Sequence, residues 1–218
     1  MKIIELHESV TASNDRDADE IRKKMKEQGV LLINLMSSPG SGKTVLLSAT
    51  IQALKDKYKI GVMEADIESE VDARLSEALG AESIQVHTDG MCHMDAGMTE
   101  EALHNMKEKN DVIFLENVGN LICPAEFDTG AGKNVMILSV PEGDDKPLKY
   151  PLMFQKSDVL IISKIDTMTY FDFNLERCQK YARELNPDIA IFPLSAKTEE
   201  GMAEWTDWLE STQKEWRK

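Results

Sequence analysis

An apolar run that leads into a glycine-rich segment constrains the fold of this chain more than any other feature. Residues 31–36 are strand-like, residues 37–44 read Ser-Ser-Pro-Gly-Ser-Gly-Lys-Thr, and a helical pattern follows. This order predicts a strand, a phosphate-binding loop and a helix, because glycines let backbone N–H groups converge on phosphate oxygens at a helix N-terminus. Ser37 stands where the strict motif has Gly. We expect it to be tolerated because Gly40 and Gly42 supply the unusual dihedral angles.

The residues of this loop and of two later strand ends form the expected nucleotide and magnesium site. Lys43 would reach the terminal phosphates and the Thr44 hydroxyl would ligate magnesium. Asp66 and Glu116 each follow an apolar run, and carboxylates at neighbouring strand ends suit the same ion. We expect these four residues to carry catalysis, with no general base assigned, since phosphoryl transfer depends mainly on positioning and charge neutralisation. Phosphate contacts are expected from Pro39, Gly40, Ser41, Gly42, Lys43, Thr44 and, in the loop that senses the terminal phosphate, Gly119.

Composition excludes several classes of protein. The 218 residues carry 25 basic and 39 acidic side chains, a formal net charge of -14, which disfavours binding to nucleic acid. No apolar run is long enough to cross a bilayer, and the N-terminal residues lack a signal-peptide core. We therefore expect a soluble cytoplasmic protein without membrane contacts. Its three cysteines are an odd number, which favours reduced thiols over disulfides.

The remaining pattern predicts an α/β fold in which apolar strands alternate with helices. Such alternation is typical of a three-layer P-loop NTPase with a largely parallel central sheet flanked by helices. We expect residues 1–29 to form an N-terminal helical extension packed on the domain, and residues 30–218 to form the P-loop GTPase domain. Expected strands lie at residues 31–36, 60–65, 84–88, 111–119, 134–140, 158–162 and 189–194, and a helix carrying Val71, Leu75 and Leu79 is expected after the second.

Two short motifs at later strand ends predict that the bound base is guanine. Asp166 follows one strand, and its carboxylate can accept from both N1–H and the exocyclic amine of guanine, a donor pair that adenine lacks. The stems of Lys164 and Lys197 could pack along the two faces of the purine. The last strand ends in the second motif, which comprises Ser195, Ala196 and Lys197.

A second group of residues has the chemistry of a transition-metal site. Cys92 and His93 are adjacent, and Cys123 lies in a different loop. Thiolate and imidazole suit nickel and zinc. Spacing alone fits equally well two partly buried loop cysteines beside an exposed histidine. Cys178 lies on the apolar face of a helix, so we expect it to be a small core residue.

The chain resembles the guanine-nucleotide-binding proteins of the SIMIBI class, and within them the HypB family of nickel-delivering GTPases of hydrogenase maturation. The resemblance extends from about residue 9 to the C-terminus and rests on residues 37–44, 92–95, 116–124 and 144–151. Two departures matter. Ser163 stands where GTPases usually carry Asn, so we expect a weaker contact to the base or the phosphate loop. The sequence also begins without a Cys-rich or His-rich segment, so storage-type nickel binding there is not expected.

The resemblance also implies a function for the residues with metal-binding chemistry. It implies that Cys92, His93 and Cys123 bind nickel or zinc near a dimer interface, with GTP, Mg²⁺ and Ni²⁺ (or Zn²⁺) as cofactors. Its expected partners are a second copy of the chain, in a homodimer promoted by GTP or metal, and a hydrogenase maturation partner or the hydrogenase large subunit. Since Cys123 follows Gly119 closely, loss of the terminal phosphate would move this thiolate relative to Cys92 and His93.

Three alternatives remain open from the sequence. A small-molecule P-loop kinase shares the phosphate loop, but it would not need the two base motifs and usually carries arginines in a lid. A GTPase chaperone for urease or for a cobalamin enzyme shares the fold, although the Cys-His pair followed by Met94 and Asp95 points away from the urease branch. A nucleotide-independent metal-binding protein is the alternative without enzymatic activity.

Overall fold

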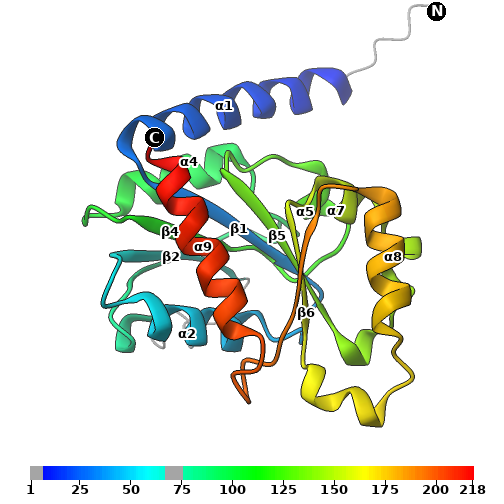
Figure 1. Ribbon diagram of the computed structural model, residues 1–218. Coiled ribbons are helices and arrows are strands. Elements are labelled where there is room, and N and C mark those ends of the chain that lie inside the picture. The colour runs from blue at the N-terminus through cyan, green and yellow to red at the C-terminus, as the bar shows by residue number, and fades with distance from the viewer. Residues whose placement is uncertain (1–6, 67–75) are drawn as a thin grey trace, which may run out of the picture.

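The computed structural model, which describes residues 7–66 and 76–218, has a central parallel sheet with helices on both faces (Figure 1). Within the described residues the sheet has seven strands in the order β3-β2-β4-β1-β5-β6-β7, and every pairing is parallel. The three-layer architecture predicted from the sequence is therefore confirmed. The strands are β1 (Leu31–Ser37), β2 (Ile60–Asp66), β3 (Glu82–His87), β4 (Val112–Glu116), β5 (Lys133–Ser139), β6 (Val159–Ser163) and β7 (Ala190–Pro193).

The helices form two layers. One face is covered by α2 and α9, and the other by α1 and α4 next to α5, α7 and α8 (Figure 1). The helices are α1 (His7–Gln28), α2 (Lys43–Leu54), α4 (Ala96–Asn105), α5 (Cys123–Glu126), α6 (Lys146–Lys149), α7 (Pro151–Lys156), α8 (Leu175–Leu185) and α9 (Met202–Trp216), with 3-10 turns η1 (Val140–Glu142) and η2 (Ile165–Tyr170).

Strand β1 is buried along its whole length because it lies in the middle of the sheet. Leu31, Ile33 and Leu35 pack in the core under α2 and α9, and the alternate side chains point to the opposite face. Two of those, Leu32 and Met36, belong to separate apolar clusters on that face. Asn34, which is polar and only 1% exposed, lies between them in the strand.

Helix α1 packs along the domain through an apolar stripe. Ala18, Ile21 and Met25 are buried together with residues of β1 and β4. The helix ends at Gln28, and Gly29 follows with a φ of 67°, a conformation that glycine adopts without steric cost. This connection lies against the C-terminal helix, where Trp216 Nε1 donates to the carbonyl of Val30 at 2.7 Å.

Helices α5, which begins at Cys123, and α6 were not predicted from the sequence, because four residues around a proline give no helical periodicity. The helix expected after β2 lies mostly outside the described residues, which resume at Ser76. No helix in the described part of the chain combines the length and apolar character needed to cross a membrane.

Candidate functional site

The phosphate loop leaves the C-terminal end of β1 and enters α2 at Lys43. Gly40 and Gly42 have φ values of 74° and 96°, the left-handed region for which the sequence selects glycine. Ser41 is buried, and its hydroxyl has no hydrogen-bond partner among the residues that the structure describes. Buried hydroxyl groups are normally satisfied, so this geometry fits a loop whose missing partner is a ligand oxygen.

Ser37 does more than tolerate the first position of the motif. Its Oγ accepts a hydrogen bond of 3.1 Å from Lys43 Nζ and donates to the carbonyl of Ser38 at 2.8 Å. The lysine head group is therefore held close to the loop on which a phosphate would sit. A glycine at this position would offer no such acceptor.

Two residues expected to bind magnesium, Thr44 and Glu116, lie close together near the C-terminal ends of β1 and β4. Thr44 Oγ1 donates to Glu116 Oε1 at 3.1 Å, and Glu116, at the end of β4, is only 8% exposed. A hydroxyl and a carboxylate this close present the oxygen donors that Mg²⁺ prefers. Asp66 ends β2, which pairs with β4, but its side chain lies outside the described part of the structure. The chemistry of the described pair fits the expected ion.

Gly119, which the sequence places in the loop expected to sense the terminal phosphate, packs against the phosphate loop. A Cβ atom built on Gly119 would lie 3.0 Å from the Pro39 side chain and 3.1 Å from its backbone nitrogen. A side chain here would require Pro39 to move by a few tenths of an ångström. The segment after β4 is therefore in direct contact with the loop that would hold the nucleotide phosphates.

Ser163, at the expected base site, contacts the phosphate loop, although the sequence predicted that this contact would be weakened. Its Oγ donates to the carbonyl of Ser41 at 2.7 Å, so the shorter side chain still reaches the phosphate loop. The next residue, Lys164, has a φ of 59°, and its Nζ donates to the carbonyl of Gly40 at 2.7 Å. Ser163 and Lys164, at the end of β6, therefore both hydrogen-bond to the phosphate loop.

The other base-site residues lie on two neighbouring segments. Asp166 lies in η2, directly after β6, and β7, which pairs with β6, leads to the segment at residues 195–197. Ser195 is buried and its Oγ accepts from the backbone N–H of Thr198 at 3.2 Å, which closes the turn there. The two motifs recognised in the sequence therefore occupy adjacent positions at one edge of the sheet.

Cys92, His93 and Cys123 converge although they come from different loops. One ligand atom from each lies within 4.8 Å of the others. Cys92 Sγ donates to Cys123 Sγ at 2.7 Å and lies 3.7 Å from His93 Nδ1. His93 is 4% exposed, and its Nε2 has no hydrogen-bond partner within residues 7–66 and 76–218. Two thiols and a buried imidazole with an unpartnered nitrogen fit a nickel or zinc site.

Burial and proximity shift the protonation of these ligands. Burial lowers the pKa of His93, and the nearby carboxylates of Asp95 and Glu126 offset only part of this effect. The hydrogen bond with Cys92 raises the pKa of Cys123, and burial of that thiol raises it further. The imidazole is therefore neutral at neutral pH, as a ligand must be, while the Cys123 thiol retains a proton that a metal ion would displace. Cys178 is fully buried, as expected for a core residue, and burial raises its pKa to about 12.

A chain of three asparagines, of which Asn34 and Asn117 are buried, joins the Cys92–His93–Cys123 centre to the centre of the sheet. Asn117, directly after Glu116, accepts from the backbone N–H of Met94 at 3.0 Å and donates to Asn34 Oδ1 at 3.1 Å. Asn34 in turn donates to Asn134 Oδ1 at 3.0 Å. Met94, which follows the Cys92–His93 pair, is therefore hydrogen-bonded to the residue directly after Glu116, at the end of β4.

Sequence reasoning missed Asn117 and Phe127. The Phe127 ring stacks on His93 with centroids 3.9 Å apart and planes 18° from parallel. For the asparagine chain a signal existed, since Asn34 interrupts an otherwise apolar strand and a buried amide needs partners. For Phe127 there was none, because one aromatic residue in a loop has no periodicity.

Comparison with known proteins agrees with this geometry. A sequence model described as "CobW/HypB/UreG, nucleotide-binding domain" matches residues 31–193. Hydrogenase maturation factor HypB of Azotobacter vinelandii is 42% identical over 210 residues, which cover 96% of this chain and 69% of that protein. Hydrogenase/urease maturation factor HypB of Helicobacter hepaticus is 44% identical over 214 residues, with 96% and 88% covered.

Solved structures agree as well. HypB from Helicobacter pylori in complex with nickel has a TM-score of 0.87 at 38% identity, covering 93% of this chain and 96% of that one. HypB from Archaeoglobus fulgidus has the same TM-score at 35% identity, with 93% and 99% covered. The signal recognition particle receptor FtsY from Elizabethkingia anophelis, at 13% identity and a TM-score of 0.54 with 88% and 68% covered, shares the fold. This chain belongs to the CobW/HypB/UreG family of nucleotide-binding domains, among the HypB hydrogenase maturation factors.

Proposed function

We propose that the protein is a GTP-hydrolysing metallochaperone that binds nickel or zinc and delivers nickel during hydrogenase maturation, with metal binding coupled to the nucleotide state. The observation that carries the proposal is the convergence of Cys92, His93 and Cys123 on loops that adjoin the nucleotide-type residues. The recipient would be a hydrogenase maturation partner or the hydrogenase large subunit. A nickel-bound HypB among the similar structures supports nickel as the cargo.

The proposed hydrolysis follows from the arrangement around the phosphate loop. Backbone N–H groups at the start of α2 would bind the phosphates, and Lys43 would move from Ser37 Oγ to the terminal phosphate oxygens. Thr44, Glu116 and Asp66 would hold Mg²⁺ directly or through water. The ion supplies charge neutralisation at the phosphates.

The proposed guanine specificity predicts a change of base in Asp166→Asn. A carboxylate accepts from N1–H and the 2-amino group of guanine, whereas an amide can donate to the 2-oxo group of xanthine. We expect GDP to bind about 10- to 100-fold more weakly, because a two-point contact is lost, and xanthosine diphosphate (XDP) to bind more tightly. Fluorescence titration with both nucleotides measures this. Asp172→Asn, at an exposed carboxylate of the same segment, is the control, and an unchanged preference in Asp166→Asn would show that Asp166 does not read the base.

The proposed metal centre predicts that affinity rises with pH. Because the pKa of Cys123 is raised, its thiol is protonated at neutral pH, and displacement of that proton by the metal makes the apparent affinity rise about tenfold per pH unit. Competition against a chelator between about pH 6.5 and 8.5 measures the slope for Ni²⁺ and Zn²⁺. Cys123→Ser should reduce the slope, whereas Cys178→Ala should leave it unchanged. A slope of zero in the unmodified protein contradicts thiol ligation.

Two connections would couple the nucleotide to the metal. The segment after β4 contacts Pro39 through Gly119 and then leads directly to Cys123. Asn117, next to Glu116, holds the backbone of Met94, next to His93. A change around the terminal phosphate would therefore reach both ligand loops, moving the second thiolate through the first connection and the Cys92–His93 pair through the second.

The coupling predicts different nickel affinities with a GTP analogue and with GDP. The ratio should lie between about 5-fold and 150-fold, the usual range for coupled sites. Asn117→Ala should bring the ratio towards one, because it removes the acceptor for Met94 N–H. Asn134→Ala is the matched control, since it breaks the far end of the asparagine chain only. Equal nickel affinities with the GTP analogue and with GDP in the unmodified protein would refute the coupling. An unaltered ratio in Asn117→Ala would refute the role of Asn117 in it.

Dimerisation would complete the metal site. Three protein ligands leave a coordination position open, and two-fold pairing can bring equivalent loops together. We expect sedimentation velocity to detect a homodimer in the presence of GTP analogue and nickel. Leaving out each ligand in turn identifies which one promotes pairing. A monomer under all of these conditions contradicts a shared site.

A further inference from the structure

Asn14 of α1 hydrogen-bonds to both of the segments that carry the metal-type ligands. Its Nδ2 donates to the carbonyl of Asp128, shortly after Cys123, at 2.9 Å. Its Oδ1 accepts from the backbone N–H of Ala96, shortly after His93, at 2.9 Å. A single amide thus bridges the start of α4 and the segment after α5, which are separated by strand β4 in the sequence. An amide that is used at both ends restrains the distance between them.

Arg22, two turns further along the same helix, holds the Cys123 side of this bridge. Its Nη2 donates to both carboxylate oxygens of Asp128, at 2.7 and 2.6 Å, and its Nε donates to the carbonyl of Ala131 at 3.1 Å. Asp128 Oδ1 also accepts from the N–H of Gly130 at 2.8 Å. Because Nη2 and Nε of one planar guanidinium bind two points of this segment, they restrain its orientation as well as its distance from α1.

The backbone packing at this contact is equally close. A Cβ atom on Gly130, whose φ is 77°, would lie 2.7 Å from Ile21 Cβ and 2.9 Å from the carbonyl of Ala18. Helix α1 and the segment at residues 128–131 are therefore in direct van der Waals contact. A side chain at residue 130 would have to push the helix away.

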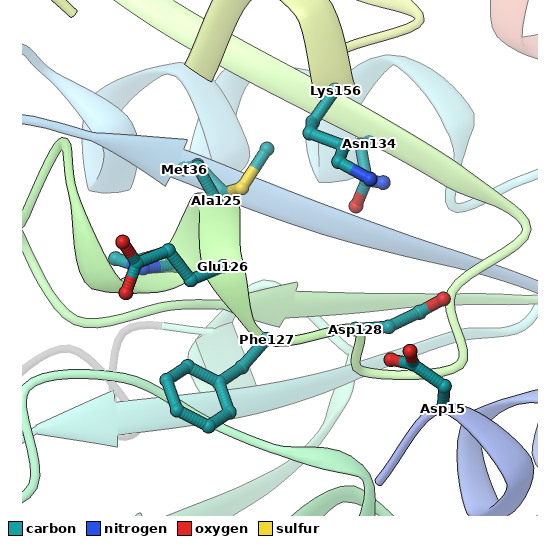
Figure 2. A pocket seen from close by; sticks show the side chains of 9 residues that line it. Asp15, Met36, Ala125, Glu126, Phe127, Asp128, Asn134 and Lys156 are labelled. Atoms are coloured by element: carbon teal, nitrogen blue, oxygen red, sulfur yellow. The ribbon is translucent and has the colours of Figure 1, made fainter. Parts of the chain in front are cut away.

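Residues 124–128 also line a partly open pocket of about 230 Å³, together with Asp15 of α1, Met36, Asn134 and Lys156 (Figure 2). Figure 2 shows the Phe127 ring directed away from Asn134 and Lys156, and this ring is the one that stacks on His93. The segment at residues 124–128 therefore contacts His93 through Phe127 and α1 through Asp128.

We propose that α1 sets the geometry of the Cys92–His93–Cys123 centre, with Asn14 as the positioning residue that holds the two ligand loops together and Arg22 as its anchor on the Cys123 side. Neither residue coordinates the metal. They act as outer contacts do at metal sites, by orienting the ligands before the ion arrives. The inference rests on the proposed metal site, and it assigns to α1 a role in metal binding.

The test measures Ni²⁺ and Zn²⁺ affinity of the full chain by chelator competition, with thiolate-to-nickel charge-transfer absorption as a second readout. Asn14→Leu removes both hydrogen bonds and should weaken binding about 10- to 100-fold and shift the absorption band. Asn14→Asp keeps the acceptor for Ala96 N–H and should recover part of the loss. Gly130→Ala, which strains the backbone at this positive φ and forces α1 and the segment at residues 128–131 apart, should weaken binding as well.

Matched controls separate positioning from general stability. Glu20→Ala alters an exposed residue of the same helix and should bind metal as the unmodified protein does. Thermal unfolding and GDP affinity are measured for every variant, since a purely structural role would lower the melting temperature and leave metal affinity and the absorption band unchanged. That result in Asn14→Leu and Gly130→Ala overturns the inference. Absence of metal binding in the unmodified protein would instead overturn the proposed function.

Discussion

Parallel pairing of β4 with β1 is the constraint on which the rest of the site depends. The register sets Leu35 opposite Glu116, so both strands end at the same edge of the sheet. The phosphate loop continues from one strand and the segment that leads to Cys123 continues from the other. Parallel strands deliver their C-terminal loops to one edge, and this brings the Thr44 hydroxyl to the Glu116 carboxylate.

Buried polar groups connect this edge to the metal-type centre. Asn34 on β1 lies opposite Asn134 on β5, and Asn117 directly follows β4; Asn117 donates to Asn34, and Asn34 donates to Asn134. A buried amide without partners would be costly, so such a chain restrains the strands and loops that it joins. The backbone of Met94 is attached to the end of this chain. The position of the Cys92–His93 pair therefore depends on the centre of the sheet.

Two substitutions relative to the usual GTPase motifs have local compensations. Ser37 accepts a hydrogen bond from Lys43 where the strict motif has glycine, and Ser163 donates to the phosphate loop where Asn is usual. In both places a hydroxyl group on a short side chain reaches its partner because the backbone elements are close together. At Ser37 the hydroxyl adds a contact that glycine would not make, and at Ser163 it supplies a contact to the phosphate loop from a side chain shorter than Asn.

The amino-acid sequence by itself determined the phosphate loop, the alternation of strands and helices, and the identity of the candidate ligands. These features are local: glycine spacing, apolar runs and thiol or imidazole groups act over a few residues. It did not predict α5, Phe127 against His93, or the bridge made by Asn14, because each depends on contacts between segments far apart in the chain. Only the tertiary structure decided that Cys123 lies beside Cys92 and His93, since strand order and register, which no local pattern encodes, bring their two loops to one edge of the sheet.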